Sequence, residues 1–404
     1  MKIRFAEIDG KSPQFWALLA ALGAVILVGL FAALNMEHHG HIITGMTNQI
    51  VWGTPHVFAV FLIVAASGAL NVASIGSVFA KTPYKPLGRL SGVLAIMLLA
   101  GGLMILVLDL GRADRLIVAM TYYNFKSIFA WNIILYNGFF AIVGVYLWMM
   151  MDKTVKKYSS RAGFVAFLWR LILTTGTGSI FGFIVARQGY DAAILAPTFV
   201  INSFAYGLAI FLLVLFAAYK WTGRELGDVL VDRLRKLLAV FVGAVLYFVI
   251  VFHLTNLYAT EHHDFEKFIL LGHNGGGVFA TIFWVGQVLI GIVLPLAILL
   301  SPSTGANQKL IGVASILVII GGLAQMYVTI IGGQAFPLVL FPGMIESSSF
   351  HDGQVAHYAP SSWEVMLGLG GVALSIAATT FALKVLPLLP QSLANAVVDP
   401  HAKS

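Results

Sequence analysis

The chain has 404 residues with a net charge of +7, and 59% of the residues are hydrophobic while only 10% are charged. A soluble domain has about 25% charged and 45–50% apolar residues, so this composition excludes an ordinary soluble enzyme and favours a protein with several membrane spans. The sequence has no Cys, which excludes disulfides, thiolate metal sites, cysteine nucleophiles and an iron–sulfur cluster held by its own cysteines.

Ten apolar runs are long enough to cross a bilayer, whose hydrocarbon core of about 30 Å requires about 20 helical residues. We expect spans at 14–34, 56–80, 90–110, 128–151, 163–187, 197–219, 237–258, 275–300, 310–333 and 363–386. The first run is too long for the apolar segment of a signal peptide, so we expect it to remain as a span. No gap could hold a folded soluble domain, and the predicted fold is a single all-α integral membrane domain over 1–404.

The distribution of positive charge predicts the orientation of these spans. Of the 24 Lys and Arg residues, 17 fall in the two terminal segments and the even-numbered loops, and only five fall in the other loops. Basic loops stay in the cytoplasm, so we expect both termini there, in a bacterial inner membrane, with the other loops in the periplasm. Ten of the 11 His residues lie on the outer side, where we therefore expect any proton chemistry.

The triplet Glu-His-His occurs twice on this outer side, at 37–39 and 261–263. Adjacent histidines are a weak zinc signal without a third ligand at a defined spacing. We therefore expect His38, His39, His262 and His263 to be solvated, and we expect no metal site.

Ionisable residues inside spans cost about 2.5–3.5 kcal/mol at the membrane centre, and each requires an explanation. Snorkelling to the nearer membrane face explains Lys384 and is the expectation for Arg170, for which an inward-facing partner is the alternative. Asp109 ends the third run, with Arg112 and Arg115 one and two turns further on, which predicts a partly buried ion pair. Such a carboxylate is either an interface anchor or a proton acceptor whose pKa the arginines set.

Four polar side chains fall at a similar depth near the outer surface on different runs: His56, Asp109, Tyr136 and His253. Each alone is more simply an interface residue or an interhelical hydrogen-bonding residue. Together, however, a histidine, a tyrosine and a carboxylate can hydrogen-bond two carbonyl oxygens and exchange protons. Quinone chemistry requires both abilities, and its lipid-soluble substrate enters from the bilayer.

Three segments carry a family resemblance: Trp52–His56, Asp109–Arg112 (Asp-Leu-Gly-Arg) and Gly333–Gly343 (Gly-Gln-Ala-Phe-Pro-Leu-Val-Leu-Phe-Pro-Gly). With the ten runs, they resemble the NrfD/PsrC family, the membrane subunits of polysulfide-reductase-like complexes, over nearly the whole chain. The resemblance implies two four-helix bundles, formed by runs 2–5 (about 56–187) and 6–9 (about 197–333) and flanked by runs 1 and 10.

The resemblance also implies a site for menaquinone or ubiquinone near the periplasmic face, under an iron–sulfur partner subunit. His56 is expected to contact the quinone head group and Asp109 to lie on a proton path, so these two are the expected catalytic residues. The expected cofactor-binding set is Trp52, His56, Arg112, Tyr136 and His253. Electrons would come from a cofactor of the partner, other subunits of the complex are expected, and nucleic acid is not. The loop 334–362, in which Pro337 and Pro342 prevent a regular helix, is expected to form part of the partner dock or a re-entrant segment.

The function expected from these residues is a quinone-interacting subunit of a respiratory redox complex. One alternative is a b-type cytochrome, but only His56 and His253 lie in or at the ends of runs, which allows at most one haem with two axial histidines. The other alternative is a secondary transporter, for which matched Gly- or Pro-broken helices in two inverted repeats would be expected.

Overall fold

The computed structural model of the protein describes residues 3–338 and 353–398. Within these ranges ten helices are long and apolar enough to cross a membrane, which confirms the all-α integral membrane fold. Residues 339–352, which include Pro342 of the expected partner dock, lie outside the described residues.

The ten spans agree with the apolar runs to within a few residues at most ends. Eight are single helices: α1 (Pro13–His39), α2 (Thr54–Ser77), α3 (Gly88–Leu108), α5 (Ile128–Met151), α6 (Ser159–Gly182), α7 (Leu195–Thr222), α8 (Asp228–Tyr258) and α14 (Ser362–Val385). The eighth span joins α10 (Gly277–Thr281), the π-helix η7 (Ile282–Val293) and α11 (Leu294–Leu300). The ninth joins α12 (Gln308–Tyr327), the π-helix η8 (Val328–Gly332) and α13 (Gly333–Ala335).

Short elements connect the spans. They are η1 (His41–Ile43), η2 (Thr82–Leu87), η3 (Ala113–Arg115), α4 (Leu116–Thr121), η4 (Lys156–Tyr158), η5 (Thr260–His262), α9 (His263–Leu271), η6 (His273–Gly275) and, after the last span, α15 (Asn395–Val398).

The largest difference from the expected boundaries is at α8, which begins at Asp228 rather than at 237. Asp232 lies 2.7 Å from both Arg235 and Lys236 one turn further along, so the charged segment continues the helix beyond its apolar part. A search for apolar runs detects only the part of a helix that lies in hydrocarbon, and it misses such an extension.

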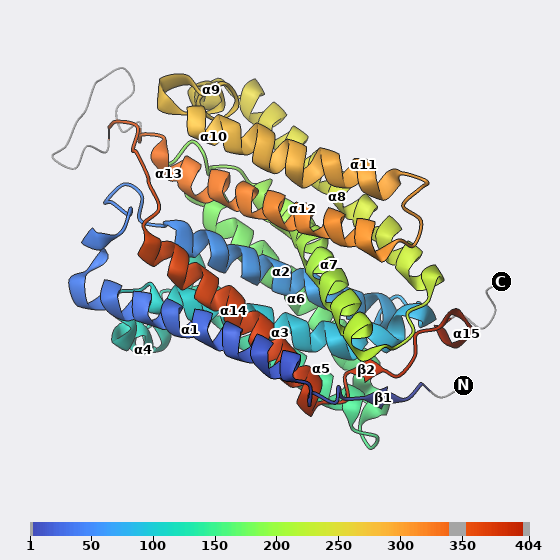
Figure 1. Cartoon of the computed structure of the whole chain (residues 1–404). Helices are drawn as coiled ribbons and strands as arrows, with labels where there is room; N and C mark the ends of the chain where they lie inside the picture. The colour runs from blue at the N-terminus through green and yellow to red at the C-terminus, as the bar shows by residue number, and fades with distance from the viewer. Residues whose placement is uncertain (1–2, 339–352, 399–404) are drawn as a thin grey trace.

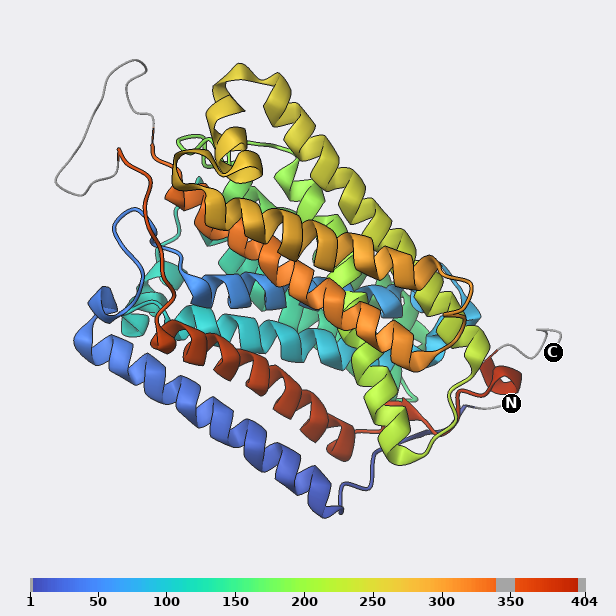
Figure 2. The same ribbon diagram turned by 45° about the horizontal axis from the view of Figure 1, so that its top comes forward.

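The spans form two bundles. Helices α2, α3, α5 and α6 pack together in the first, and α7, α8, the α10–α11 span and α12 pack together in the second. Contacts of α2 with α7 and α12 join the two bundles, while α1 packs on α14 and α14 packs on α2 and α3 (Figures 1 and 2). The flanking pair α1 and α14 therefore covers the first bundle.

Small residues permit the closest approach between the bundles, where α2 crosses α7. A Cβ added to Gly68 would overlap the main-chain oxygen of Ser203, and one added to Gly207 would overlap the backbone of Gly68 and Ala69. Since apolar side chains gain little by leaving lipid for another helix, close backbone packing of this kind is a main source of association between helices in a membrane.

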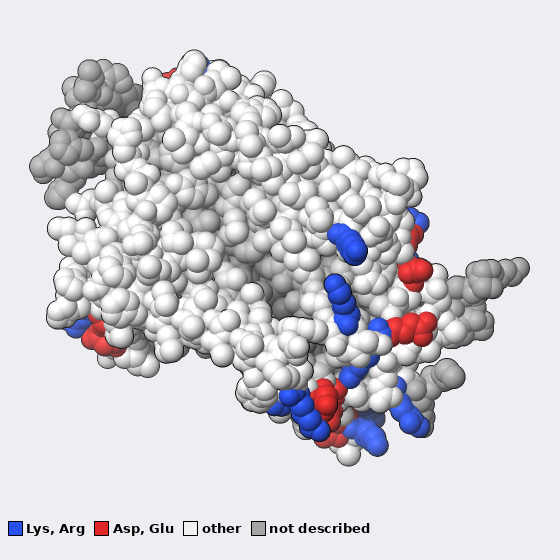
Figure 3. All heavy atoms as spheres, viewed as in Figure 1, with Lys and Arg blue, Asp and Glu red and all other residues white. Residues whose placement is uncertain are grey.

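Both termini lie at the same end of the molecule (Figure 1), as an even number of spans requires. There β1 (Phe5–Ala6) pairs antiparallel with β2 (Leu389–Pro390). On the face seen in Figure 3, most of the charged side chains gather at this end. We call it the terminal end, and we call the opposite one the distal end.

Arg170 does not snorkel, and this expectation was wrong. Its side chain is fully buried, and its guanidinium donates a 2.8 Å hydrogen bond to Oδ1 of Asn71 on α2. The rings of Phe167 and Phe204 lie 5.0 and 4.9 Å from the guanidinium carbon. Arg170 therefore faces the interior because α2 supplies a polar acceptor and two aromatic rings enclose it.

Candidate functional site

The start of α2 positions His56. Helix α2 begins at Thr54, with Pro55 in its first turn where no backbone donor is required, so His56 lies in the first turn at the distal end. The hydroxyl of Tyr358 accepts a 2.6 Å hydrogen bond from the nitrogen of Thr54 and contacts the carboxylate of Glu364 on α14. This link fixes the first turn of α2 against the first turn of α14.

Gln334 positions the neighbouring Trp52 from the second bundle. Its side-chain oxygen accepts hydrogen bonds from the nitrogens of Val51 (2.9 Å) and Trp52 (3.0 Å), and its amide donates to the oxygen of Trp52 (2.9 Å). Gln334 lies in the Gly333–Gly343 motif, whose loop sequence reasoning assigned to a partner dock or a re-entrant segment. The signal was therefore present, but the contact spans 282 residues and could not be deduced from the sequence alone.

Asp109, directly after the last residue of α3, lies between two histidines. Its Oδ2 is 3.0 Å from Nδ1 of His56, and its Oδ1 is 3.5 Å from Nε2 of His41. The same His41 nitrogen donates a 3.0 Å hydrogen bond to the main-chain oxygen of Asp109. Side-chain exposure is 1% for Asp109, 22% for His56 and 33% for His41, so the buried carboxylate connects a histidine on α2 to one that reaches the distal surface. Sequence reasoning gave His41 no role.

The electrostatics of this group favour a charged carboxylate. Burial raises the pKa of Asp109, but the contacts with His41 and His56 outweigh burial, and the pKa falls below its ordinary value. The hydrogen bond with Asp109 raises the pKa of His41, although burial opposes it. The contact between the two side chains therefore favours an ionised Asp109 together with a protonated His41.

The expected ion pair of Asp109 with Arg112 or Arg115 was wrong. Arg112 instead pairs with Asp114 at 3.0 Å, and both side chains are more than half exposed. Among the described residues, neither Arg112 nor Arg115 lies within ion-pair distance of Asp109. Because Gly111 follows with a left-handed backbone (φ +69°), the chain turns away after Asp109 and carries the arginines outward.

His56 lines a pocket of about 440 Å³, within the range of about 300–1,000 Å³ typical of small-molecule sites. Trp52 and Tyr136 line the same pocket, so the structure brings together three of the expected site residues. The remaining walls are mostly apolar and come mainly from α3, α4, α5 and α6, with Val60 of α2 and Ile330 of η8. Leu110 and Phe129, which also line it, are about half exposed at the lipid-facing surface. A hydrophobic ligand can therefore reach the pocket from the bilayer.

Asn132, which also lines the pocket, forms a link between helices. Its amide donates to the oxygens of Ile128 (2.9 Å) and of Gly176 on α6 (3.1 Å). The side chain thereby joins α5 to α6 and fixes the wall that carries Tyr136.

His253 lies elsewhere, in the second bundle. Its Nδ1 is 2.7 Å from Oε2 of Glu266, which is fully buried on α9 and also accepts a 2.8 Å hydrogen bond from Asn256. His253 lines a separate, small pocket of about 40 Å³ with Gln287 and Gln325. His56 and His253 were expected to lie at a similar depth. In the structure they contact different carboxylates, Asp109 and Glu266, and line different cavities.

The two Glu-His-His triplets differ. His38 and His39 are exposed, as expected, whereas His262 is buried and its Nδ1 donates to the main-chain oxygen of Gln188 at 2.9 Å, so its expected solvation was wrong. Among the described residues, no group of three or more His, Asp and Glu side chains has the arrangement of a metal site.

Fold and pocket together define a multi-pass helical membrane protein with an acid–base group at the edge of a lipid-accessible cavity. The family model described as polysulphide reductase, NrfD, matches residues 42–338. The protein belongs to this family.

Three relatives extend the comparison. The Hdr-like menaquinol oxidoreductase integral membrane subunit of Archaeoglobus fulgidus is 30% identical over 99% of this chain and 100% of its own length. The C subunit of selenate reductase from Mesobacillus selenatarsenatis is 24% identical, with 91% and 92% covered. The C subunit of polysulfide reductase from Wolinella succinogenes is 22% identical, with 72% and 96% covered.

Proposed function

We propose that this protein is the quinone-interacting membrane subunit of a respiratory sulfur-metabolism complex, and that the pocket lined by His56 binds the quinone head group. The observation that carries the proposal is the contact of His56 with a buried carboxylate at the wall of a lipid-accessible pocket. The name of the Archaeoglobus relative supports menaquinol as the quinone substrate, and the name of the Wolinella relative supports a complex that reduces a sulfur compound. The finer assignment, a DsrP-like subunit of a DsrMKJOP-type complex, rests on the sequence resemblance.

Each residue of the site has a defined role in this proposal. Nδ1 of His56 lies 3.0 Å from Oδ2 of Asp109, which leaves its Nε2 to hydrogen-bond one quinone oxygen, and the hydroxyl of Tyr136 is the candidate donor to the other. Oxidation of a quinol releases two electrons and two protons. The two electrons go to the cofactor of the partner subunit, and the two protons leave one after the other. For each of them, His41 releases its proton to the distal surface, and Asp109 then passes to His41 the proton that His56 takes from the quinol. Quinone reduction uses the same path in reverse.

Electrons require a partner, because the sequence has no Cys for an iron–sulfur cluster. We place a DsrO-like iron–sulfur subunit on the distal, periplasmic face, above Trp52 and the segment that follows Gln334. The hydrogen bonds between Gln334 and the backbone of Val51 and Trp52 support this placement, since they connect the pocket wall directly to that surface.

The test is quinol-linked turnover of the purified complex carrying His56→Ala. Loss of an acid–base group typically lowers a rate by about 10²–10⁴-fold, and we expect that loss with the complex fully assembled. Asp109→Asn should also slow turnover, with a changed pH profile, because a neutral amide cannot relay a proton. His39→Ala is the matched control, since His39 is exposed and, within the described ranges, its side chain hydrogen-bonds to the oxygen of Asn35 on its own helix and to no other residue. Wild-type turnover of an assembled His56→Ala complex would refute the site.

A further inference from the structure

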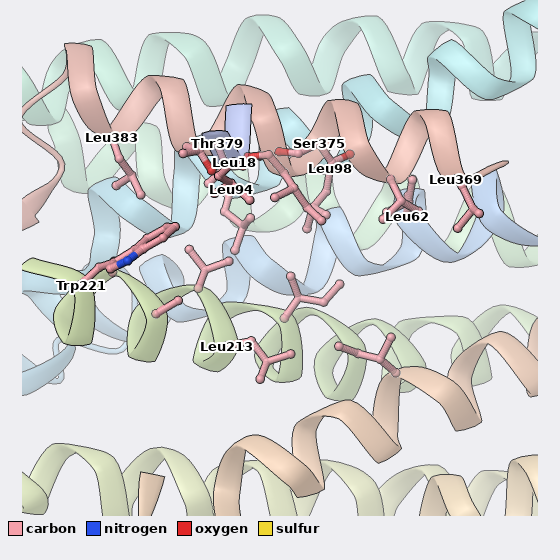
Figure 4. A pocket seen from close by; sticks show the side chains of 18 of the residues that line it. Leu18, Leu62, Leu94, Leu98, Leu213, Trp221, Leu369, Ser375, Thr379 and Leu383 are labelled. Carbon is pink, nitrogen blue, oxygen red and sulfur yellow. Dashed lines mark hydrogen bonds between the residues drawn. The ribbon is translucent and has the colours of Figure 1, made fainter. Parts of the chain in front are cut away.

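A second large cavity, of about 490 Å³, lies between α14 and α7, with α2 and α3 as its floor. We call it the apolar slot. In Figure 4 it extends from Leu369 at one end to Trp221 and Leu383 at the other, and these last two side chains point toward each other from α7 and α14. The slot shares no lining residue with the pocket around His56 and is therefore a separate cavity.

The hydroxyl groups that line the slot are already occupied within their own helix. Ser375 donates to the oxygen of Gly371 (3.2 Å), Thr379 to that of Ser375 (2.7 Å) and Thr380 to that of Ile376 (2.8 Å). A hydroxyl that donates to a backbone oxygen of its own helix points toward that helix, so the carbon atoms of the side chain face the slot. The slot therefore offers a hydrocarbon surface and fits an alkyl chain better than a polar ring.

At the terminal end the slot continues into a polar cavity of about 710 Å³, with which it shares Ile8, Trp221 and Thr222. We call this cavity the polar basin; Glu7, Asp9, Lys11, Arg224 and Lys384 supply its charges. Trp221 is 58% exposed at the junction, and tryptophan is enriched at the depth of lipid head groups. An apolar slot that opens into a charged basin at this depth has the polarity profile of a phospholipid.

Two opposite charges in the basin have no ion-pair partner among the described residues. Lys11 lies 3.4 Å from Asp9, and Arg224 donates to main-chain oxygens, including that of Glu7 at 2.7 Å. The ammonium of Lys384 lies 4.1 Å from the ring centroid of Trp16, and no carboxylate in the described ranges is within ion-pair distance of it. Likewise, no cationic side chain in those ranges is within ion-pair distance of the Glu7 carboxylate. One ammonium and one carboxylate complement a head group that carries a phosphate and an amine.

We propose that the slot and basin bind a phospholipid with an ethanolamine-type head group, from the leaflet that faces the termini. One acyl chain fills the slot, Lys384 binds the phosphate and Glu7 binds the amine. The lipid occupies the gap between α14 and α7 and so attaches the flanking pair to the second bundle. The proposal is independent of the function of the His56 pocket.

The first experiment measures lipid retained by the complex after purification in mild detergent, with extraction and mass spectrometry. Val214→Trp on α7 fills the slot, and Val240→Trp on α8 is the matched control, because Val240 is 65% exposed and lines neither slot nor basin. We expect the wild-type protein and the control to retain a phosphatidylethanolamine in fixed ratio to the protein, and Val214→Trp to lose it. Equal retention by both variants, or loss of a quinone instead, would overturn the proposal.

The second experiment leaves the slot unchanged and so does not depend on how the Trp variant folds. Delipidated wild-type complex should gain thermal stability with added phosphatidylethanolamine and less with phosphatidylglycerol, and Lys384→Gln should lose most of the gain. Equal stabilisation by both lipids, in the wild-type protein and in Lys384→Gln alike, would show only non-selective bilayer lipid and would contradict the head-group assignment.

Discussion

Asp109 tolerates burial at the membrane edge because two histidines share its charge. A buried carboxylate without a partner costs several kcal/mol, and a protonated imidazole beside it offsets part of that cost. With His41 and His56 on opposite oxygens, the group can hold one mobile proton on either side of the carboxylate while its net charge stays zero. This arrangement suits a relay, whereas a permanently charged arginine, the partner expected from the sequence, would hold no mobile proton.

The His41–Asp109 contact predicts a pH-dependent contribution to stability. The pKa of His41 is raised from 6.5 in the folded state, so its contribution is complete below pH 6.5 and is lost as the pH rises through the raised value. The pKa of Asp109 is lowered from 3.8, so its contribution is present above pH 3.8 and is lost as the pH falls through the lowered value. We expect His41→Gln to lower the thermal unfolding temperature more at pH 5, which lies between 3.8 and 6.5, than at pH 9.

The control for this measurement is His39→Gln, which alters an exposed histidine two residues away and should change the unfolding temperature little at any of these pH values. A His41→Gln effect that is the same at pH 5 and pH 9 would mean that the side chain acts through packing and not through its charge.

His56 and His253 also predict the absence of a b-type haem. Each imidazole has one nitrogen at a buried carboxylate, Asp109 or Glu266, and they line different pockets, whereas a haem with two axial histidines requires both rings to face one cavity. We expect the reduced-minus-oxidised spectrum of the purified protein to lack a b-type Soret band. Such a band, lost on changing either histidine to Ala, would instead establish the cytochrome alternative.

At the scale of single residues, the sequence predicted which polar residues lie at the site better than it predicted which residues contact them. His56, Asp109 and Tyr136 could be found because polar groups at membrane depth require an explanation, and that reasoning requires no knowledge of packing. The contact of His41 with Asp109 crosses 68 residues and that of Gln334 with Trp52 crosses 282, so both depend on how loops and bundles meet.

Among the elements, α2 is the one most enclosed by others, and its crossing with α7 depends on glycine. Gly68→Val should destabilise the protein by about 1–3 kcal/mol or more, because the side chain would overlap the backbone of Ser203 and force the bundles apart. Thermal unfolding of the purified protein measures the loss. Gly243→Val on α8 is the matched control, since a Cβ there meets no atom within 4 Å. Equal stability of the two variants would show that the crossing does not require close contact.

The position of each span was predictable because it depends on local apolar content, and the run 128–151 coincides with Ile128–Met151. Which face of a span points inward was not predictable from the same information. Arg170 was assigned to the membrane surface for this reason, because nothing near it in sequence reveals Asn71 on α2.

For the whole molecule, the packing of the bundles leaves its orientation in the membrane undetermined, and only charge predicts it. The fold puts both termini at one end (Figure 1) and gathers charged side chains there (Figure 3). Basic loops resist translocation, so the terminal end should face the cytoplasm and the His41–Asp109–His56 relay should open to the periplasm. This orientation decides on which side of the membrane the proposed quinone chemistry exchanges its protons.

The absence of Cys makes the orientation directly testable, since any introduced thiol is the only one in the protein. Glu37→Cys, in the last turn of α1, and Gly353→Cys place exposed thiols at the distal end, and Lys153→Cys and Ser303→Cys place them on loops of the terminal end. A membrane-impermeant maleimide should label the first pair in spheroplasts and the second pair only after the membrane is opened. The two pairs control for each other, because all four positions are exposed and lie on opposite predicted sides of the membrane. Labelling of Lys153→Cys or Ser303→Cys in sealed spheroplasts, with Glu37→Cys protected, would invert the map, and the relay would then deliver its protons to the cytoplasm.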